Sequence, residues 1–188
     1  MKLILASQSP YRKHALDILN LKYEVIPSNI DESKIRHEDK KTMAKILAEA
    51  KAKKVGKTNS NAIIVASDLF VVYKNQVFEK PHQEEKAKEM LKTLSGNTFE
   101  IITGLAVLNT KTNKILSTTE ICKVIFRDLS DYEINDYVSR YPAIKCAGGF
   151  GPEGMLRFAE YVEGNYNFRI SLPQNKLIEF LRENNIQV

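Results

Sequence analysis

Several features that mark common protein classes are missing from this sequence. No apolar run approaches the length of a membrane-spanning helix, and no basic segment followed by an apolar stretch of signal-peptide length stands at the N-terminus. The two cysteines, Cys122 and Cys146, lack metal-type spacing, and a chain of 188 residues needs no disulfide to support its core. We therefore expect a cytoplasmic protein with reduced thiols and no membrane partner.

The best-known nucleotide-binding and catalytic motifs are missing as well. No G-x-x-x-x-G-K-[ST] occurs, and no G-x-G-x-x-G opens a helix after the first apolar segment. The three histidines, His14, His37 and His82, are too dispersed for a metal cluster, and the chain has no nucleophile elbow. By motif, the protein is therefore neither a P-loop nucleotide hydrolase nor a Rossmann dehydrogenase.

The composition that is present is typical of a globular protein. With 43% hydrophobic and 27% charged residues, the chain has enough apolar side chains for one large domain. It contains no internal repeat or low-complexity linker, so we expect a single domain over 1–188. The net charge of +5 suits nucleic acid or a phosphorylated small molecule. Because lysine and arginine are scattered along the chain, a local anion site is favoured over a nucleic-acid surface.

The N-terminal stretch Lys2–Lys13 predicts a strand, a tight loop and a helix. Ser9 is placed to cap the helix, and Pro10 suits the first helical position because its missing N–H would be unpaired there. Arg12 lies in the first turn, where a positive charge is unfavourable unless an anion offsets it. The pattern therefore predicts an anion-binding helix N-terminus. The alternative is a strand–helix unit whose basic residues point into water.

A second helix is expected over about 42–54, where apolar residues recur with helical spacing from Met43 to Ala50. Lys51 directly follows Ala50 and is expected to flank this apolar stripe. Two interpretations are open, a side chain that reaches into a cleft or one that snorkels to the surface. The local pattern favours snorkelling.

Asp68 stands between two apolar runs, 62–66 and 69–73, each of strand length. A carboxylate in that position is costly unless it is paired or bound to a metal. Asp68 is therefore a candidate for chemistry, with a bulge or turn as the alternative. Glu32 lies near the end of a strand or loop, and Lys80 follows a further short apolar segment.

The rest of the chain predicts alternating helices and long strands. Helical patterns end near Ser95-Gly96 and Pro142, the second of them opened by the capping box Ser130 to Glu133. Further elements are expected at 99–108, 115–126, 158–162 and 174–183. The segment 146–154 holds four of the eight glycines, so Glu153 is interpreted as facing a site or as part of an ordinary loop.

The opening Leu-Ala-Ser-x-Ser-Pro-x-Arg resembles that of the Maf family of nucleotide pyrophosphatases. Further family elements follow in order as Asp31-Glu32, Lys51, Ser67-Asp68, Lys80-Pro81, Leu94-Ser95-Gly96, Thr103-Gly104 and the segment from Cys146 to Gly154. The resemblance implies a mixed α/β fold like that of inosine triphosphate pyrophosphatases, with two lobes around a central mixed sheet and a nucleotide cleft. A homodimer is also suggested by the resemblance.

The resemblance further implies hydrolysis of a nucleoside triphosphate between its α and β phosphates, with Mg²⁺, Mn²⁺ or Co²⁺. Asp68 matches the proposed proton acceptor and Glu32 a metal-linked acid, so these two residues are the implied metal ligands. The resemblance implies four phosphate-binding positions, which are Ser7, Arg12, Lys51 and Lys80. It also assigns catalytic roles to Lys51 and Lys80. The expected partner is therefore a small nucleotide, not a nucleic acid.

Three positions, Tyr11, Leu69 and Glu153, discriminate between branches of the family. Tyr11 and Glu153 resemble the branch that acts on 7-methyl-GTP, whereas Leu69 departs from both branches. A methylated guanine is a cation on which an aromatic ring can stack, and a carboxylate can accept hydrogen bonds from its N1–H and N2–H₂ edge. Two other departures are Glu79 and Ser171, each of which stands where glycine is usual.

We therefore hypothesise a house-cleaning pyrophosphatase that removes 7-methyl-GTP. Within the same chemistry, the alternative is an enzyme for dTTP and UTP or one of broad specificity. From other classes, the alternatives are a non-catalytic nucleotide-binding regulator of cell division and a nucleic-acid-binding protein driven by the positive charge.

Overall fold

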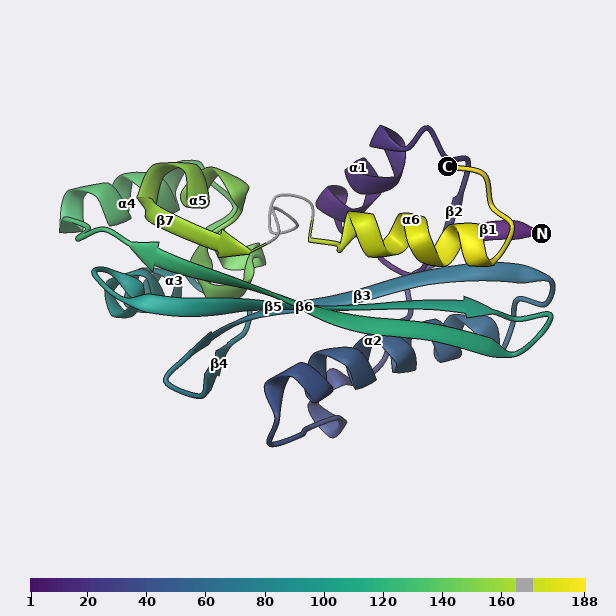
Figure 1. Ribbon diagram of the computed structural model, residues 1–188. Helices are drawn as coiled ribbons and strands as arrows, with labels where there is room; N and C mark the ends of the chain where they lie inside the picture. Colours follow the sequence, from purple (N-terminus) through teal and green to yellow (C-terminus); the bar gives the residue numbers. More distant parts are fainter. Residues whose placement is uncertain (165–170) are drawn as a thin grey trace. The chain divides into compact units, whose positions relative to one another are not determined.

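The computed structural model describes residues 1–164 and 171–188, which divide into two compact units. Unit 1 comprises Met1–Asp68, Thr103–Glu120 and the described residues 171–188. Unit 2 comprises Leu69–Ile102 and the described residues 121–164. Strands of one sheet contribute residues to both units (Figure 1). Within the described ranges, no helix is long and apolar enough to cross a membrane.

The described residues form a mixed α/β fold, as the sequence predicts. The helices are α1 (Pro10–Ile18), α2 (Lys40–Gly56), α3 (Glu84–Leu94), α4 (Asp131–Arg140), α5 (Pro152–Phe158) and α6 (Gln174–Glu183), with short 3₁₀ helices η1 (Glu32–Lys34), η2 (Ala143–Lys145) and η3 (Ala147–Gly149). The strands are β1 (Lys2–Leu5), β2 (Glu24–Val25), β3 (Ala62–Tyr73), β4 (Gln76–Phe78), β5 (Thr98–Asn109), β6 (Lys114–Phe126) and β7 (Ala159–Gly164).

The strands form a single mixed sheet in the order β2-β1-β3-β5-β6-β7, with β4 paired to β3. Strand β1 pairs in parallel with both β2 and β3, and its register places Leu5 opposite Val25 and Val65. Strands β4 and β7 pair antiparallel with β3 and β6, respectively. The parallel part of the sheet therefore lies in unit 1, where β1 and β2 end beside the middle of β3.

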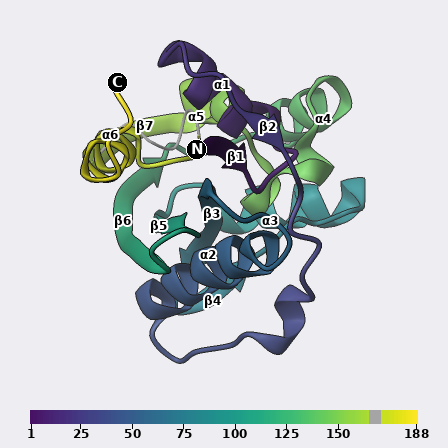
Figure 2. The ribbon, with the colours of Figure 1, turned by 90° about the vertical axis from the view of Figure 1, so that its right-hand side faces the viewer.

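Unit 1 has helices on both faces of its part of the sheet (Figure 2). Leu3 and Leu5 point to one face, where they join the apolar cluster that includes residues of α1 and α6. Ile4 and Ala6 point to the other face, where they pack with residues of α2. Because successive side chains of a strand point to opposite faces, both faces can be apolar only when the strand is covered twice. This explains the unbroken apolar runs of β1 and β3.

Helix α2 begins at Lys40 and ends at Gly56, two residues beyond each end of the predicted helix. The side chain of Asp39 caps it by accepting the N–H groups of Lys41 and Thr42. Its small residues face the sheet closely, since a Cβ on Gly104 of β5 would lie only 2.2 Å from the carbonyl oxygen of Ala44. This close approach requires glycine in β5.

Unit 2 packs α3, α4 and α5 around one apolar cluster. Phe99, Phe126, Phe150 and Phe158 meet in edge-to-face pairs, with ring centroids 4.8–5.7 Å apart, and Tyr137 of α4 joins them. The predicted capping box is confirmed, since the side chain of Ser130 accepts from the Glu133 N–H and that of Glu133 from the Ser130 N–H. The predicted bounds of α6 are also confirmed.

Three local expectations are wrong. The hydroxyl of Ser9 makes no cap bond to α1; instead the Ser9 N–H donates to Ser7 Oγ at 3.2 Å. Asp68 does not separate two strands, because β3 runs unbroken through it. The glycine-rich segment is not all loop, because it ends in α5, a helix with Pro152 at its first position.

Candidate active site

The ends of β1 and β2 and the middle of β3 bring three predicted site residues, Ser7, Glu32 and Asp68, to one part of unit 1. Ser7 follows β1, and Ser67 and Asp68 occupy β3 just beyond the residue paired with Leu5. The chain leaves β2 with the Ile26 N–H bonded to the Leu5 carbonyl and reaches Glu32 at the start of η1. In parallel sheets the carboxyl ends of strands are where side chains from neighbouring strands converge on a ligand.

Lys51 reaches this part of unit 1 from α2 and holds two carboxylates. Its Nζ lies 2.5 Å from Asp68 Oδ1 and 2.8 Å from Glu32 Oε1. Lys51 and Asp68 are each only 6% exposed, so the favoured interpretation that Lys51 snorkels to the surface is wrong. The helix is rotated relative to the predicted stripe, with Ile46 exposed and Lys51 on the face that the alanines share.

Arg12 reaches the same cluster from the first turn of α1. Its Nη1 donates to Ser7 Oγ and its Nε to the carbonyl oxygen of Ser171, each at 3.2 Å. Burial lowers the pKa of the Arg12 guanidinium, and the nearby carboxylates of Asp68 and Glu32 oppose this shift. Arginine nevertheless stays protonated at physiological pH, so the cluster holds two cations beside two acids.

Sequence reasoning missed the part that Ser67 and Ser171 have in this cluster. Ser67 is 1% exposed, and its Oγ donates to the carbonyl oxygen of Ser171 at 3.2 Å, the same oxygen that accepts from Arg12. Ser171 has a φ of 53°, in the left-handed region that favours glycine. The departure from glycine noted at Ser171 was the available signal, because it pointed to unusual backbone at that position.

The arrangement can bind a polyphosphate and accept a proton. Arg12 offers a planar fork for two phosphate oxygens and Lys51 a point charge, while the buried carboxylate of Asp68 is an acceptor. No group of three or more histidine, cysteine or acidic residues suited to a metal ion occurs in the described part of the chain.

The remaining predicted site residues have separate settings. Tyr11 is half-buried in the first turn of α1 in unit 1. In unit 2, Lys80 is exposed and follows β4. Leu69, which was predicted to determine substrate specificity, packs partly against the apolar cluster of this unit.

Glu153 lies in the first turn of α5 and not in a loop. Among the buried side-chain nitrogen and oxygen atoms of the described residues, its Oε2 is the one that has no hydrogen-bond partner. A shielded carboxylate oxygen without a donor is unfavourable by roughly 1–3 kcal/mol or more. The Glu153 side chain is therefore suited to accept an N–H group from a bound molecule.

Comparison with known proteins places the chain in a family. A family model described as Maf-like protein matches residues 2–184. The chain belongs to this family, in agreement with the resemblance in its motifs.

Two relatives with different named substrates match the whole chain. A 7-methyl-GTP pyrophosphatase of Hydrogenovibrio crunogenus (strain DSM 25203 / XCL-2) is 38% identical over 189 residues, covering 100% of this chain and 94% of the relative. A dTTP/UTP pyrophosphatase of Bacillus cereus (strain AH820) is 34% identical over 188 residues, covering 100% of this chain and 97% of the relative. Among solved structures, a HAM1 protein from Coxiella burnetii aligns over 97% of this chain and 99% of its own, with 15% identity and a TM-score of 0.47.

Proposed function

We propose that this protein hydrolyses a nucleoside triphosphate between its α and β phosphates and releases a monophosphate and pyrophosphate. The observation that carries the proposal is the cluster in which Lys51 joins Asp68 and Glu32 beside Arg12. The whole-length relatives named as nucleotide pyrophosphatases support the same chemistry.

Each member of the cluster has a role in this proposal. Arg12 and Lys51 bind phosphate oxygens, and the Ser7 hydroxyl, which holds the Arg12 guanidinium, lies beside them. Asp68 accepts a proton from the water that attacks the α phosphorus, and the pyrophosphate group leaves. Lys80 is a further proposed phosphate-binding residue.

Glu32 and Asp68 are suited to a divalent metal ion. Both carboxylates already hold one cationic group, the Lys51 ammonium, so their oxygens lie within reach of a single cation. Mg²⁺ commonly binds one or two protein carboxylates together with substrate phosphates and water. Mg²⁺, Mn²⁺ or Co²⁺ held by Glu32 and Asp68 would neutralise charge on the phosphates.

For the base, we propose 7-methylguanine. The unpartnered Oε2 of Glu153 fits a purine edge that presents N1–H and N2–H₂ donors, and Tyr11 is an aromatic ring suited to a cationic base. A thymine or uracil offers a single ring N–H. A dTTP/UTP or broad-specificity enzyme is the alternative, since one whole-length relative carries that name.

The catalytic proposal is tested by pyrophosphate release from a nucleotide panel with Mg²⁺ or Mn²⁺. Asp68→Asn is expected to lower kcat by about 10²–10⁴-fold, the usual contribution of a positioned base. Glu24→Gln is the control, because Glu24 is an exposed acid of unit 1 that forms a surface ion pair with Lys2. No pyrophosphate from any nucleotide, or equal rates in the two variants, would contradict the proposal.

The substrate proposal is tested by comparing 7-methyl-GTP with dTTP and UTP. Glu153→Gln keeps the size of the side chain and removes its charge, so we expect KM for 7-methyl-GTP to rise about tenfold. Faster turnover of dTTP or UTP by the wild type would favour the pyrimidine alternative.

A further inference from the structure

Tyr137 is a polar side chain in the core of unit 2 that the proposed reaction does not use. It is among the largest fully buried side chains of the chain, on the inner face of α4. Its ring packs edge-to-face on Phe158 and stacks on Tyr141, with centroids 4.9 Å and 4.8 Å apart. A phenylalanine would make the same ring contacts, so packing alone does not account for the hydroxyl group.

The hydroxyl oxygen of Tyr137 binds the backbone at the start of α5. The Gly151 N–H donates to it at 3.0 Å. Helix α5 has no side-chain cap of its own at Gly151, so its first N–H groups need an acceptor from elsewhere. Tyr137 supplies that acceptor from another helix.

The close approach of Tyr137 depends on glycine in α5. A Cβ on Gly154 would lie 2.9 Å from the Tyr137 hydroxyl oxygen and 2.8 Å from Phe150 Cβ, closer than real Cβ contacts. Glycine at position 154 thus has a definite steric cause. It lets the first turn of α5 rest on the Tyr137 hydroxyl.

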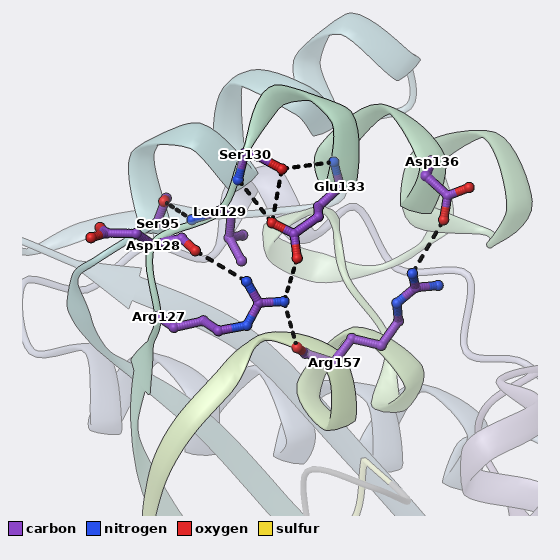
Figure 3. Close-up of polar contacts among 8 residues, drawn as sticks. All are labelled: Ser95, Arg127, Asp128, Leu129, Ser130, Glu133, Asp136 and Arg157. Atoms are coloured by element: carbon purple, nitrogen blue, oxygen red, sulfur yellow. Dashed lines mark hydrogen bonds and ion pairs between the residues drawn. The ribbon is translucent and has the colours of Figure 1, made fainter.

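The other end of α5 is also tied to α4 and to Arg127, which follows β6 (Figure 3). Arg127 Nη2 donates to the carbonyl oxygen of Arg157 at 3.1 Å and lies 2.5 Å from Glu133 Oε1. Arg157 Nη2 lies 3.2 Å from Asp136 Oδ2. With both ends held, the first turn of α5 has a fixed place in unit 2.

Glu153 stands in that first turn, between Gly151, whose N–H bonds to the Tyr137 hydroxyl, and Gly154, which leaves room for that hydroxyl. Burial raises the pKa of Tyr137 to about 12, and the charge of Glu153 adds to this shift, so the phenol is neutral at physiological pH. Glu153 Oε2 has no hydrogen-bond partner in the described residues. The position from which this side chain extends is set by the first turn of α5, which Tyr137 contacts at Gly151.

We propose that Tyr137 is a positioning residue for base recognition: its hydroxyl fixes the first turn of α5 and thereby aims the Glu153 carboxylate at the base. This inference rests on the proposed role of Glu153. A hydrogen bond weakens steeply with distance and angle, so a small displacement of this turn weakens base binding and leaves phosphate binding unchanged.

The test measures binding without turnover. In Tyr137→Phe, the dissociation constant of 7-methyl-GMP, measured by calorimetry, should rise about tenfold. Inhibition by inorganic tripolyphosphate, which has no base, should be unchanged. Amide hydrogen exchange at 151–154 should be faster. The matched control is Tyr73→Phe, which removes a hydroxyl bonded to Asn97 in the same unit and should change none of the three.

Equal affinity of Tyr137→Phe and wild type for 7-methyl-GMP would overturn the inference, as would an equal loss for tripolyphosphate, which indicates a merely structural role. If Tyr137→Phe does not fold, Gly154→Ala displaces the same contact and is expected to show the same selective loss. A wild type that binds 7-methyl-GMP but releases no pyrophosphate from any triphosphate overturns the proposed function and leaves this inference standing.

Discussion

Lys51 shows how one side chain can make a group of like charges compatible with burial. The carboxylates of Asp68 and Glu32 would repel each other in a setting that is poorly hydrated, and the Lys51 ammonium bonds to both. The Lys51–Asp68 pair is buried, whereas Glu32 is about half exposed. The proposed reaction depends on the same balance of charges, because a bound polyphosphate adds negative charge that the cations of Arg12 and Lys51 neutralise.

Replacing Lys51 by methionine should therefore destabilise the protein strongly. Removal of one partner from a buried ion pair typically lowers the free energy of unfolding by roughly 3–5 kcal/mol. Lys53→Met is the matched control on the same helix, because Lys53 is exposed and its pair with Glu49 is a surface pair worth about 0–1 kcal/mol. Urea unfolding of both variants checks this, and similar losses would show that the Lys51 pair is not buried in solution.

At the scale of elements, the site depends on how closely α2 approaches the sheet. Gly104 leaves no room for a Cβ against the backbone of Ala44, and this contact sets the helix face that carries Lys51. The large apolar residues of α2 predicted that a different face of this helix is buried, because the hydrophobic pattern gives little weight to small alanines. The rotation of α2 could not be predicted without the partner strand.

Gly104→Ala should accordingly lower the free energy of unfolding by roughly 1–3 kcal/mol through overpacking. Gly56→Ala, at the end of α2, is the control. There the nearest atom is a methyl group of Leu108 that can move, and alanine favours helix, so we expect little loss. Thermal unfolding compares the two; a larger loss at Gly56 would contradict the close packing of α2 and β5.

The α4 N-terminus gives the protein a pH-dependent stability (Figure 3). The Arg127 side chain, with smaller contributions from the Ser130 N–H and hydroxyl, lowers the pKa of Glu133 from 4.5 to about 2. Because the folded-state pKa is depressed, the stabilisation is present above pH 4.5 and is lost as the pH falls towards 2. Glu133→Gln should flatten this loss.

The measurement is the free energy of unfolding by urea at pH 5 and pH 3. Wild type should lose more stability than Glu133→Gln over this interval, while Glu100→Gln, at an exposed position of β5, should follow the wild type. Parallel behaviour of wild type and Glu133→Gln would show that the network with Arg127 does not hold Glu133 in its charged form.

For the molecule as a whole, periodicity predicted most elements, and the ordered family motifs predicted which residues matter. Register explains why Ser7 and Asp68 lie in one part of unit 1, since β1 and β3 pair in parallel. The sequence did not reveal α5, because glycines that permit contact with Tyr137 resemble a loop. Nor did it reveal the Ser171 carbonyl as a partner of Arg12, because a backbone atom far along the chain leaves no pattern of its own.

The α–β position of cleavage is the central claim of the proposed function. Water activated beside Asp68 is expected to attack the α phosphorus. The oxygen atom of that water then becomes part of the monophosphate. Attack at the β phosphorus would release the same two products but place that oxygen in pyrophosphate, and attack at the γ phosphorus would release orthophosphate.

The most direct measurement is hydrolysis of 7-methyl-GTP in water enriched in oxygen-18, followed by phosphorus NMR of the products. We expect equal amounts of labelled monophosphate and unlabelled pyrophosphate, with their formation slowed about 10²–10⁴-fold in Asp68→Asn. Label in pyrophosphate or orthophosphate, or an Asp68→Asn variant as fast as the wild type, would contradict this expectation.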